Sequence, residues 1–135
     1  RTSGCRAEER AIRARALELL DFLGIADCAD TLATNLAFGQ QRAVEMARAL
    51  AMEPSLLLLD EPAAGLNIYE TAEIGRLIVR IRELGITVLL VEHDMSLVMD
   101  ISDEIVVLSF GQKIAEDIPT IIQQDPEVIK VYLGE

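Results

Sequence analysis

The sequence predicts an α/β fold with a mostly parallel sheet and flanking helices. Apolar residues recur at the three-to-four spacing of amphipathic helices in several segments. Two short, continuous apolar runs, 56–59 and 88–91, alternate with these segments and are typical of buried strands. The 135 residues are 51% hydrophobic, which is enough for a packed core and excludes a disordered chain.

The first part of the chain predicts two helices. Residues 8–23 carry an apolar stripe, and Gly24 is a suitable residue to end that helix. The stripe consists of Ile12, Ala16, Leu19, Leu20 and Leu23. Residues 25–38 predict an irregular link with one helical turn. Residues 40–52 predict the second helix, which ends before Pro54.

The middle of the chain predicts a strand, a helix and a second strand. The run Leu56–Leu59 is the pattern of a strand that is covered on both faces, and Thr87–Val91 predicts another buried strand. Between them, a helix follows Asn67, which is a suitable N-cap, and ends at Gly85. Its stripe consists of Ile74, Leu77, Ile78, Ile81 and Leu84.

The last part predicts short elements. Residues 95–101 predict a helix with Asp94 as its N-cap. Residues 105–109 and 112–115 predict a hairpin around Phe110 and Gly111. Two short terminal helices are expected, at 119–124 and 126–133, because each begins with a proline in its first turn.

Charge and composition exclude several classes of protein. The net charge is −11, of which residues 1–16 contribute +3 and the rest −14. An acidic body is repelled by phosphate backbones, so nucleic acid is not an expected partner. No apolar run approaches the ~20 residues of a membrane span. Two cysteines and one histidine do not supply a disulfide framework or a zinc site.

Asp60 and Glu61 directly follow the first predicted strand. Ligands bind at this edge of open α/β sheets. Asp60 is suited to hold a hydrated Mg²⁺, and Glu61 is suited to accept a proton from an attacking water. The alternative is a solvated acidic turn.

Two further segments are candidates for phosphate chemistry. Gly39 lies where a helix is about to begin, so backbone N–H groups there can approach an anion, although an ordinary turn is the alternative. His93 follows the second predicted strand and reaches the edge that carries Asp60 and Glu61 if the strands are parallel. The alternative for His93 is a surface or core histidine without a functional role.

Four motifs in this order resemble those of ATP-binding-cassette (ABC) ATPases. They are LAFGQQRAVEMARAL, LLLLDEP, AAGLN and VEHD, which resemble the signature motif, Walker B strand, D-loop and H-loop. The variants LAFGQQR, DEPAAGLN and EHDMSLVM and the tail DPEVIKVYLGE resemble the ATP-binding subunit of branched-chain amino acid importers. The resemblance implies a partial P-loop NTPase fold with part of the helical subdomain.

The resemblance also implies residue roles. Asp60 corresponds to the Walker B aspartate at Mg²⁺, Glu61 to the general base and His93 to the switch histidine at the γ-phosphate. In the family, the signature residues bind the γ-phosphate of the ATP held by the opposite subunit. They correspond here to Ala37, Phe38, Gly39 and Gln40. Asn67 falls on the D-loop position. Ala37 stands where many members have Ser, Phe38 replaces a Gly, and Asn67 replaces the usual Asp.

No G-x-x-x-x-G-K-[ST] motif occurs in the 135 residues. In the family that loop and the Q-loop lie upstream of the motifs found here, so the chain resembles the second half of the domain. The expected divisions are 1–52 (end of the helical subdomain with the signature), 53–118 (Walker B, D-loop and H-loop) and 119–135 (helical tail). We expect the isolated chain to be inactive, and its start at Arg1 suggests a truncated sequence.

The function that the resemblance implies is ATP hydrolysis that energises branched-chain amino acid uptake. Its cofactors would be ATP and Mg²⁺. Its partners would be a second ATPase subunit, identical or different, and transmembrane permease subunits, at the cytoplasmic face of the inner membrane. Two alternatives remain: a non-catalytic interaction module derived from such an ATPase, and a cassette ATPase that acts on DNA or ribosomes, which the acidic body argues against.

Overall fold

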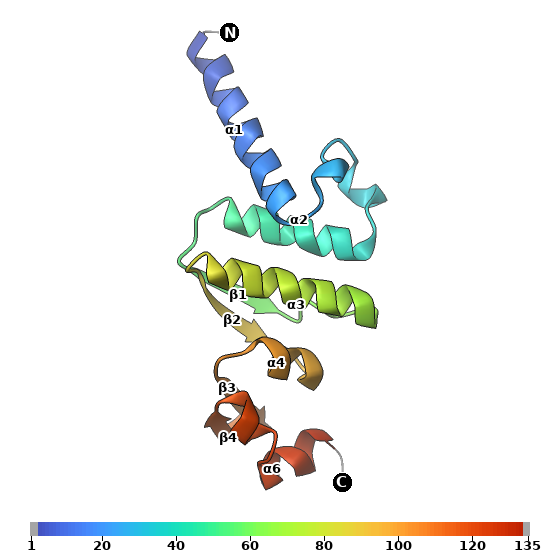
Figure 1. Cartoon of the computed structure of the whole chain (residues 1–135), viewed down its shortest axis with the longest axis vertical. Coiled ribbons are helices and arrows are strands. Elements are labelled where there is room, and N and C mark those ends of the chain that lie inside the picture. Colours follow the sequence, from blue (N-terminus) through green and yellow to red (C-terminus); the bar gives the residue numbers. More distant parts are fainter. Residues whose placement is uncertain (1–2, 134–135) are drawn as a thin grey trace.

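The computed structural model describes residues 3–133; residues 1–2 and 134–135, at the ends of the first and last predicted divisions, lie outside the described residues. The molecule is elongated, with α1 at one end and the C-terminal elements, including α6, at the other (Figure 1). The helices are α1 (Ser3–Phe22), α2 (Phe38–Leu50), α3 (Ile68–Glu83), α4 (Met95–Ile101), α5 (Pro119–Ile122) and α6 (Pro126–Val128). The strands are β1 (Leu56–Asp60), β2 (Thr87–Val91), β3 (Ile105–Ser109) and β4 (Gln112–Asp117).

Strands β1 and β2 form a parallel pair connected by α3. The register runs from Leu56 opposite Thr87 to Asp60 opposite Val91. Helices α2 and α3 lie side by side against this pair (Figure 1). The core between them includes Leu57 of β1, Met46 and Leu50 of α2, and Ile78 and Ile81 of α3. The prediction of helices beside a parallel sheet is therefore confirmed.

The prediction that the strands are covered on both faces is wrong. Leu56 and Leu58 of β1 are 50% and 65% exposed, and Leu89 and Val91 of β2 are 58% and 57% exposed. Alternate residues of a strand point to opposite faces, so these four belong to one face. Within residues 3–133, α2 and α3 cover only the other face, which carries Leu57.

Helix α1 packs only at its C-terminal end. Of the predicted stripe, Leu19 and Leu23 are buried, but Ile12 is 65% exposed and Ala16 is also exposed. The helix is longer than predicted and projects away from α2, so its first turns meet no other element among the described residues (Figure 1). The link to α2 contains two 3-10 turns, Ala26–Cys28 and Ala33–Asn35, where one helical turn was predicted.

A close approach between α3 and α4 explains the glycine inside α3. A Cβ added at Gly75 would lie 2.9 Å from Leu97 Cδ1 and 3.6 Å from Ile101 Cγ2 of α4. A glycine in a helix interior costs about 1 kcal/mol relative to alanine. That cost is offset here by the packing of α4, whose Leu97 is 5% exposed.

The C-terminal elements form a second, smaller core. Strands β3 and β4 pair antiparallel, and the buried residues there are Ile105, Val107, Ile122 and Val128. Met95, Val98 and Met99 of α4 pack against this core, whereas Leu97 and Ile101 face α3, so α4 lies between the two cores. The predicted helix at 126–133 is α6 followed by a π-helical turn, Ile129–Leu133. Among the residues described, no helix combines the length and apolar character needed to cross a bilayer.

Candidate functional site

The carboxyl ends of β1 and β2 lie at one edge of the parallel pair. Asp60 is the last residue of β1 and is opposite Val91, the last residue of β2. Glu61 and His93 follow these strands within two residues. The prediction that His93 reaches the edge of Asp60 and Glu61 depended on parallel strands, and the observed pairing confirms that condition.

Glu61 and His93 approach each other at this edge. His93 Nδ1 lies 3.5 Å from Glu61 Oε1, and the two side chains are 71% and 52% exposed, so both are open to a ligand. Glu61 has φ +45, a left-handed conformation that is uncommon for a residue other than glycine. The Glu61 N–H donates to the Val91 carbonyl oxygen at 2.8 Å, which ties the turn to β2 and helps to maintain this conformation.

Asp60 has a different environment. It is exposed and occupies the strand face of Leu56 and Leu58. None of the described side chains or amides donates to its carboxylate within hydrogen-bond distance. The described residues contain no cluster of three or more metal-ligating side chains. A single free carboxylate fits Mg²⁺, which is usually bound by one or two carboxylates together with substrate phosphates and waters.

Sequence reasoning missed Glu92. Its side chain is only 1% exposed, although it lies between Val91 and the exposed His93. Glu92 Oε1 accepts from the Ala63 N–H at 2.9 Å, and Oε2 accepts from the His93 N–H at 3.1 Å. Glu92, His93 and Asp94 line a small pocket with Thr71 and residues 63–66. The available signal was a carboxylate beside the single histidine, but nothing in the sequence indicated that this carboxylate is buried.

The predicted signature residues begin α2. Ala37 is the N-cap and its N–H donates to Gln40 Oε1 at 3.0 Å, while the first bond along the helix is Gln41 N–H to the Ala37 carbonyl at 3.0 Å. The amides of Phe38 and Gly39 therefore lie in the first turn, where the helix leaves N–H groups without partners along its own backbone. The helix start predicted at Gly39 is therefore present, and N–H groups at such a position can approach an anion.

Gln40 is held by a residue that the sequence did not single out. Gln40 Nε2 donates to Cys28 Sγ at 3.2 Å, and the Cys28 thiol donates to Asp27 Oδ1 at 3.6 Å. Desolvation raises the pKa of the Cys28 thiol, and the charge and hydrogen bond of Asp27 raise it further. The Cys28 sulfur therefore helps to orient the Gln40 amide.

The signature residues contact the beginning of α3. A Cβ added at Gly65 would lie 3.2 Å from Phe38 Cε1, so the Phe38 ring packs against the bare backbone of Gly65, which has φ +78. A Cβ at Gly39 would lie 3.7 Å from Glu70 Oε1. The structure thus gathers the predicted residues in two groups: Asp60, Glu61 and His93 at the sheet edge, and residues 37–40 beside the loop that contains Asn67.

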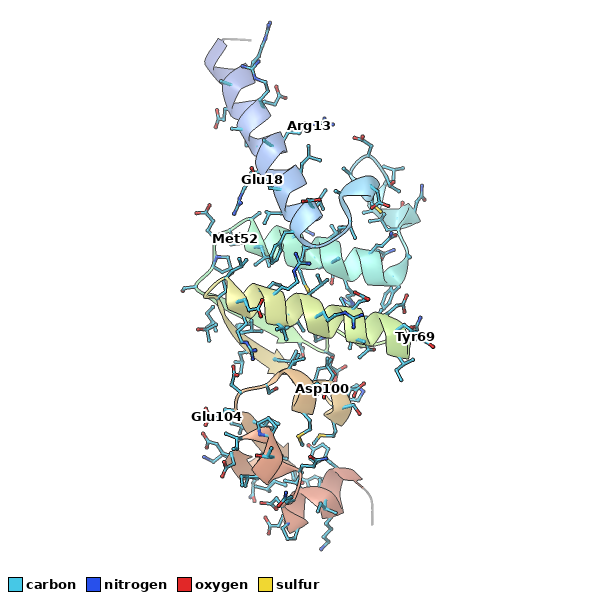
Figure 2. The ribbon with its side chains drawn as sticks, in the orientation of Figure 1. Arg13, Glu18, Met52, Tyr69, Asp100 and Glu104 are labelled. Atoms are coloured by element: carbon cyan, nitrogen blue, oxygen red, sulfur yellow. The ribbon has the colours of Figure 1, made fainter. Side chains whose placement is uncertain are left out.

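Asn67 is the N-cap of α3, as predicted. Asn67 Oδ1 accepts from the N–H groups of Tyr69 at 2.9 Å and Glu70 at 3.0 Å, and the Asn67 N–H donates to Glu70 Oε2 at 3.0 Å. This is a reciprocal capping box. In Figure 2, Tyr69 marks this N-terminal end of α3. Met52, which follows the C-terminal end of α2, lies at the opposite end of the two helices.

We expect Asn67→Ala to lower the free energy of unfolding by about 1 kcal/mol, because two first-turn amides lose their acceptor. Chemical denaturation checks this value. The matched control is Asn67→Asp, whose carboxylate accepts the same bonds and interacts favourably with the N-terminus of the helix dipole. Equal losses in the two variants would contradict the capping role.

Comparisons with known proteins agree with the motif order. Residues 2–64 match the family model described as "ABC transporter", and residues 112–135 match "Branched-chain amino acid ATP-binding cassette transporter". The chain is 46% identical over 136 residues to the High-affinity branched-chain amino acid transport ATP-binding protein BraF of Pseudomonas aeruginosa, with 100% of this chain and 53% of BraF covered.

Two further relatives extend the likeness to another organism and to a solved structure. The chain is 47% identical over 131 residues to LivG of Escherichia coli K12, a branched-chain amino acid transport ATP-binding protein, with 96% of this chain and 51% of LivG covered. Its structure resembles the ADP conformation of MJ1267, an ATP-binding cassette of an ABC transporter, with a TM-score of 0.82, 32% identity and coverage of 90% and 50%. The chain spans about half the length of these relatives.

Proposed function

The chain is homologous to the ATP-binding subunits of ABC transporters, and from this homology we propose that the complete protein binds and hydrolyses ATP to energise the uptake of branched-chain amino acids. The identity to BraF and LivG, together with the match of residues 112–135, supports the choice of branched-chain substrates. The substrate itself would bind to other subunits.

The observation that carries the proposal is the approach of Glu61 Oε1 and His93 Nδ1 at 3.5 Å, at the strand edge that also ends in Asp60. In the proposed reaction Glu61 accepts the proton of the attacking water. His93 donates a hydrogen bond to the γ-phosphate. The contribution of these residues is mainly positioning and charge stabilisation, as in other phosphoryl transfers.

Asp60 would hold Mg²⁺ through its free carboxylate, with ATP phosphates and waters as the remaining ligands. When bound, Mg²⁺ supplies positive charge that neutralises the phosphate oxygens. Asp60 needs no rearrangement for this role, because its side chain is exposed and no described residue neutralises it.

The second group of residues is proposed to bind the ATP of an opposite subunit. Ala37 has no hydroxyl, so the first-turn amides of Phe38, Gly39 and Gln40 would bind the γ-phosphate. Gln40 is already oriented by Cys28, and Phe38 packs on Gly65 in the loop before Asn67. These contacts support a joint role for residues 37–40 and Asn67 at a subunit interface.

The proposal includes an assembly and a division of the chain. The ATPase would pair with a second, identical or different ATPase subunit and with transmembrane permease subunits at the cytoplasmic face of the inner membrane. Residues 1–52 would end the helical subdomain, 53–118 would form the catalytic part, and 119–135 the tail. In the structure the tail shares a core with β3 and β4, which belong to residues 53–118.

Two measurements test the proposal. The complete protein should hydrolyse ATP only when Mg²⁺ is present, and a protein that binds its partners without any hydrolysis would instead be a non-catalytic module. Equilibrium dialysis with labelled ATP should show no micromolar binding by the isolated 135-residue chain, because its sequence contains no G-x-x-x-x-G-K-[ST] loop. Micromolar binding by that chain would contradict the expected inactivity.

A further inference from the structure

We propose that Glu92 is a positioning residue for the reaction. It fixes the distance between Glu61 and His93 by tying the loop after β1 to the segment after β2. This inference rests on the proposed ATPase function, because the geometry that it explains is that of the proposed base and the proposed phosphate donor.

The burial of Glu92 is the first observation. A carboxylate that is 1% exposed loses its hydration, and this is costly unless hydrogen bonds replace the lost water. Both oxygens of Glu92 have such partners: the Ala63 N–H at 2.9 Å and the His93 N–H at 3.1 Å. Hydrogen bonds to an ionised carboxylate are among the stronger ones in proteins. Glu92 therefore joins two segments that are 29 residues apart.

The position of Ala63 is the second observation. Ala63 lies two residues after Glu61, which adopts the left-handed conformation at φ +45. The Glu61 N–H donates to the Val91 carbonyl, and the Ala63 N–H donates to the next residue, Glu92. Val91 and Glu92, at the end of β2, therefore accept hydrogen bonds from the two ends of the turn at Glu61, namely from the Glu61 and Ala63 amides.

The position of His93 completes the argument. Glu92 Oε2 accepts from the His93 N–H and lies 4.0 Å from His93 Nδ1. One side chain therefore restrains the backbone of His93 and the turn of Glu61. A misplacement of about 1 Å in a catalytic arrangement can lower a rate about 100-fold. Loss of Glu92 should therefore slow the reaction without removing any group that touches ATP.

The test compares three variants of the complete protein in steady-state ATPase assays and thermal unfolding. Glu92→Ala removes both acceptors, and we expect kcat to fall at least about tenfold with KM for ATP nearly unchanged. Glu92→Gln retains one acceptor for Ala63 and should recover part of kcat. The matched control is Asp125→Ala. Asp125 also accepts from two amides, those of Glu127 and Val128, but it lies in the C-terminal tail.

A normal kcat in Glu92→Ala would overturn the proposal, and so would equal losses of kcat and of thermal midpoint in Glu92→Ala and Asp125→Ala. If Glu92→Ala does not fold, Glu92→Gln decides: a reduced kcat at an unchanged midpoint supports the role, and a normal kcat overturns it.

A second readout separates this inference from the proposed function. Amide hydrogen exchange at Ala63 and His93 should accelerate at least about tenfold in Glu92→Ala but not in Asp125→Ala, because an opened hydrogen bond exposes its amide. Unchanged exchange at these two amides would overturn the proposal that Glu92 holds them, even if the enzyme is active. Absence of ATP hydrolysis by the unmodified protein would overturn the proposed function and, with it, the positioning role of Glu92. Amide exchange would still report whether Glu92 holds the Ala63 and His93 amides.

Discussion

Replacing Glu61 with glutamine is expected to lower ATP turnover of the complete protein at least about 100-fold, which is the usual contribution of a general base. Glutamine has nearly the same shape as glutamate but cannot accept the proton of the attacking water. The side chain is 52% exposed and glutamine has nearly the same size, so folding and ATP binding should be retained. Turnover and ATP binding are measured on the same preparation.

The matched control for this variant is Glu73→Gln. Glu73 is an exposed carboxylate on α3 whose partner is Arg76 on the same helix, so its replacement should leave turnover unchanged. Near-normal turnover in Glu61→Gln would reject Glu61 as the base. Loss of ATP binding together with turnover would assign Glu61 to binding instead.

His93→Ala is the second large effect, with turnover expected to fall at least about 100-fold, because a positioned donor to the transferred phosphoryl group is lost. His93 is 71% exposed, so the change removes little packing and the thermal midpoint should stay the same. The comparison variant is His93→Gln, which keeps a donor and should retain more turnover than alanine. Full activity of His93→Ala would mean that His93 is an ordinary surface residue without a role in the reaction.

Local patterns in the sequence predicted most of the element order. The bounds of β2 and α4, the cap of Asn67 on α3 and the cap of Asp94 on α4 are as predicted, because each depends on neighbouring residues. The prediction that Glu61 and His93 lie at one edge required only parallel strands.

Burial could not be predicted in the same way, because it depends on what covers an element. The run Leu56–Leu59 predicts a strand correctly, but its composition does not reveal that Leu58 is exposed among the described residues. The buried carboxylate of Glu92 and the Cys28–Gln40 hydrogen bond were missed for the same reason, since each joins segments that are distant in sequence. The reason for a glycine inside α3 was not evident from the sequence either, since it lies in the packing of Leu97 against Gly75.

The position of α4 between two cores has a consequence for cooperativity. One side of this seven-residue helix packs on α3 and the other on the C-terminal core, and the ion pair of Arg82 with Asp103 also connects the two parts. Two hydrophobic clusters that are connected mainly through one short helix are expected to unfold as separate cooperative units. A single midpoint of unfolding would then average the unfolding of two units. The stability of Asn67 and His93 variants is therefore best measured from the unfolding of the unit that contains α3.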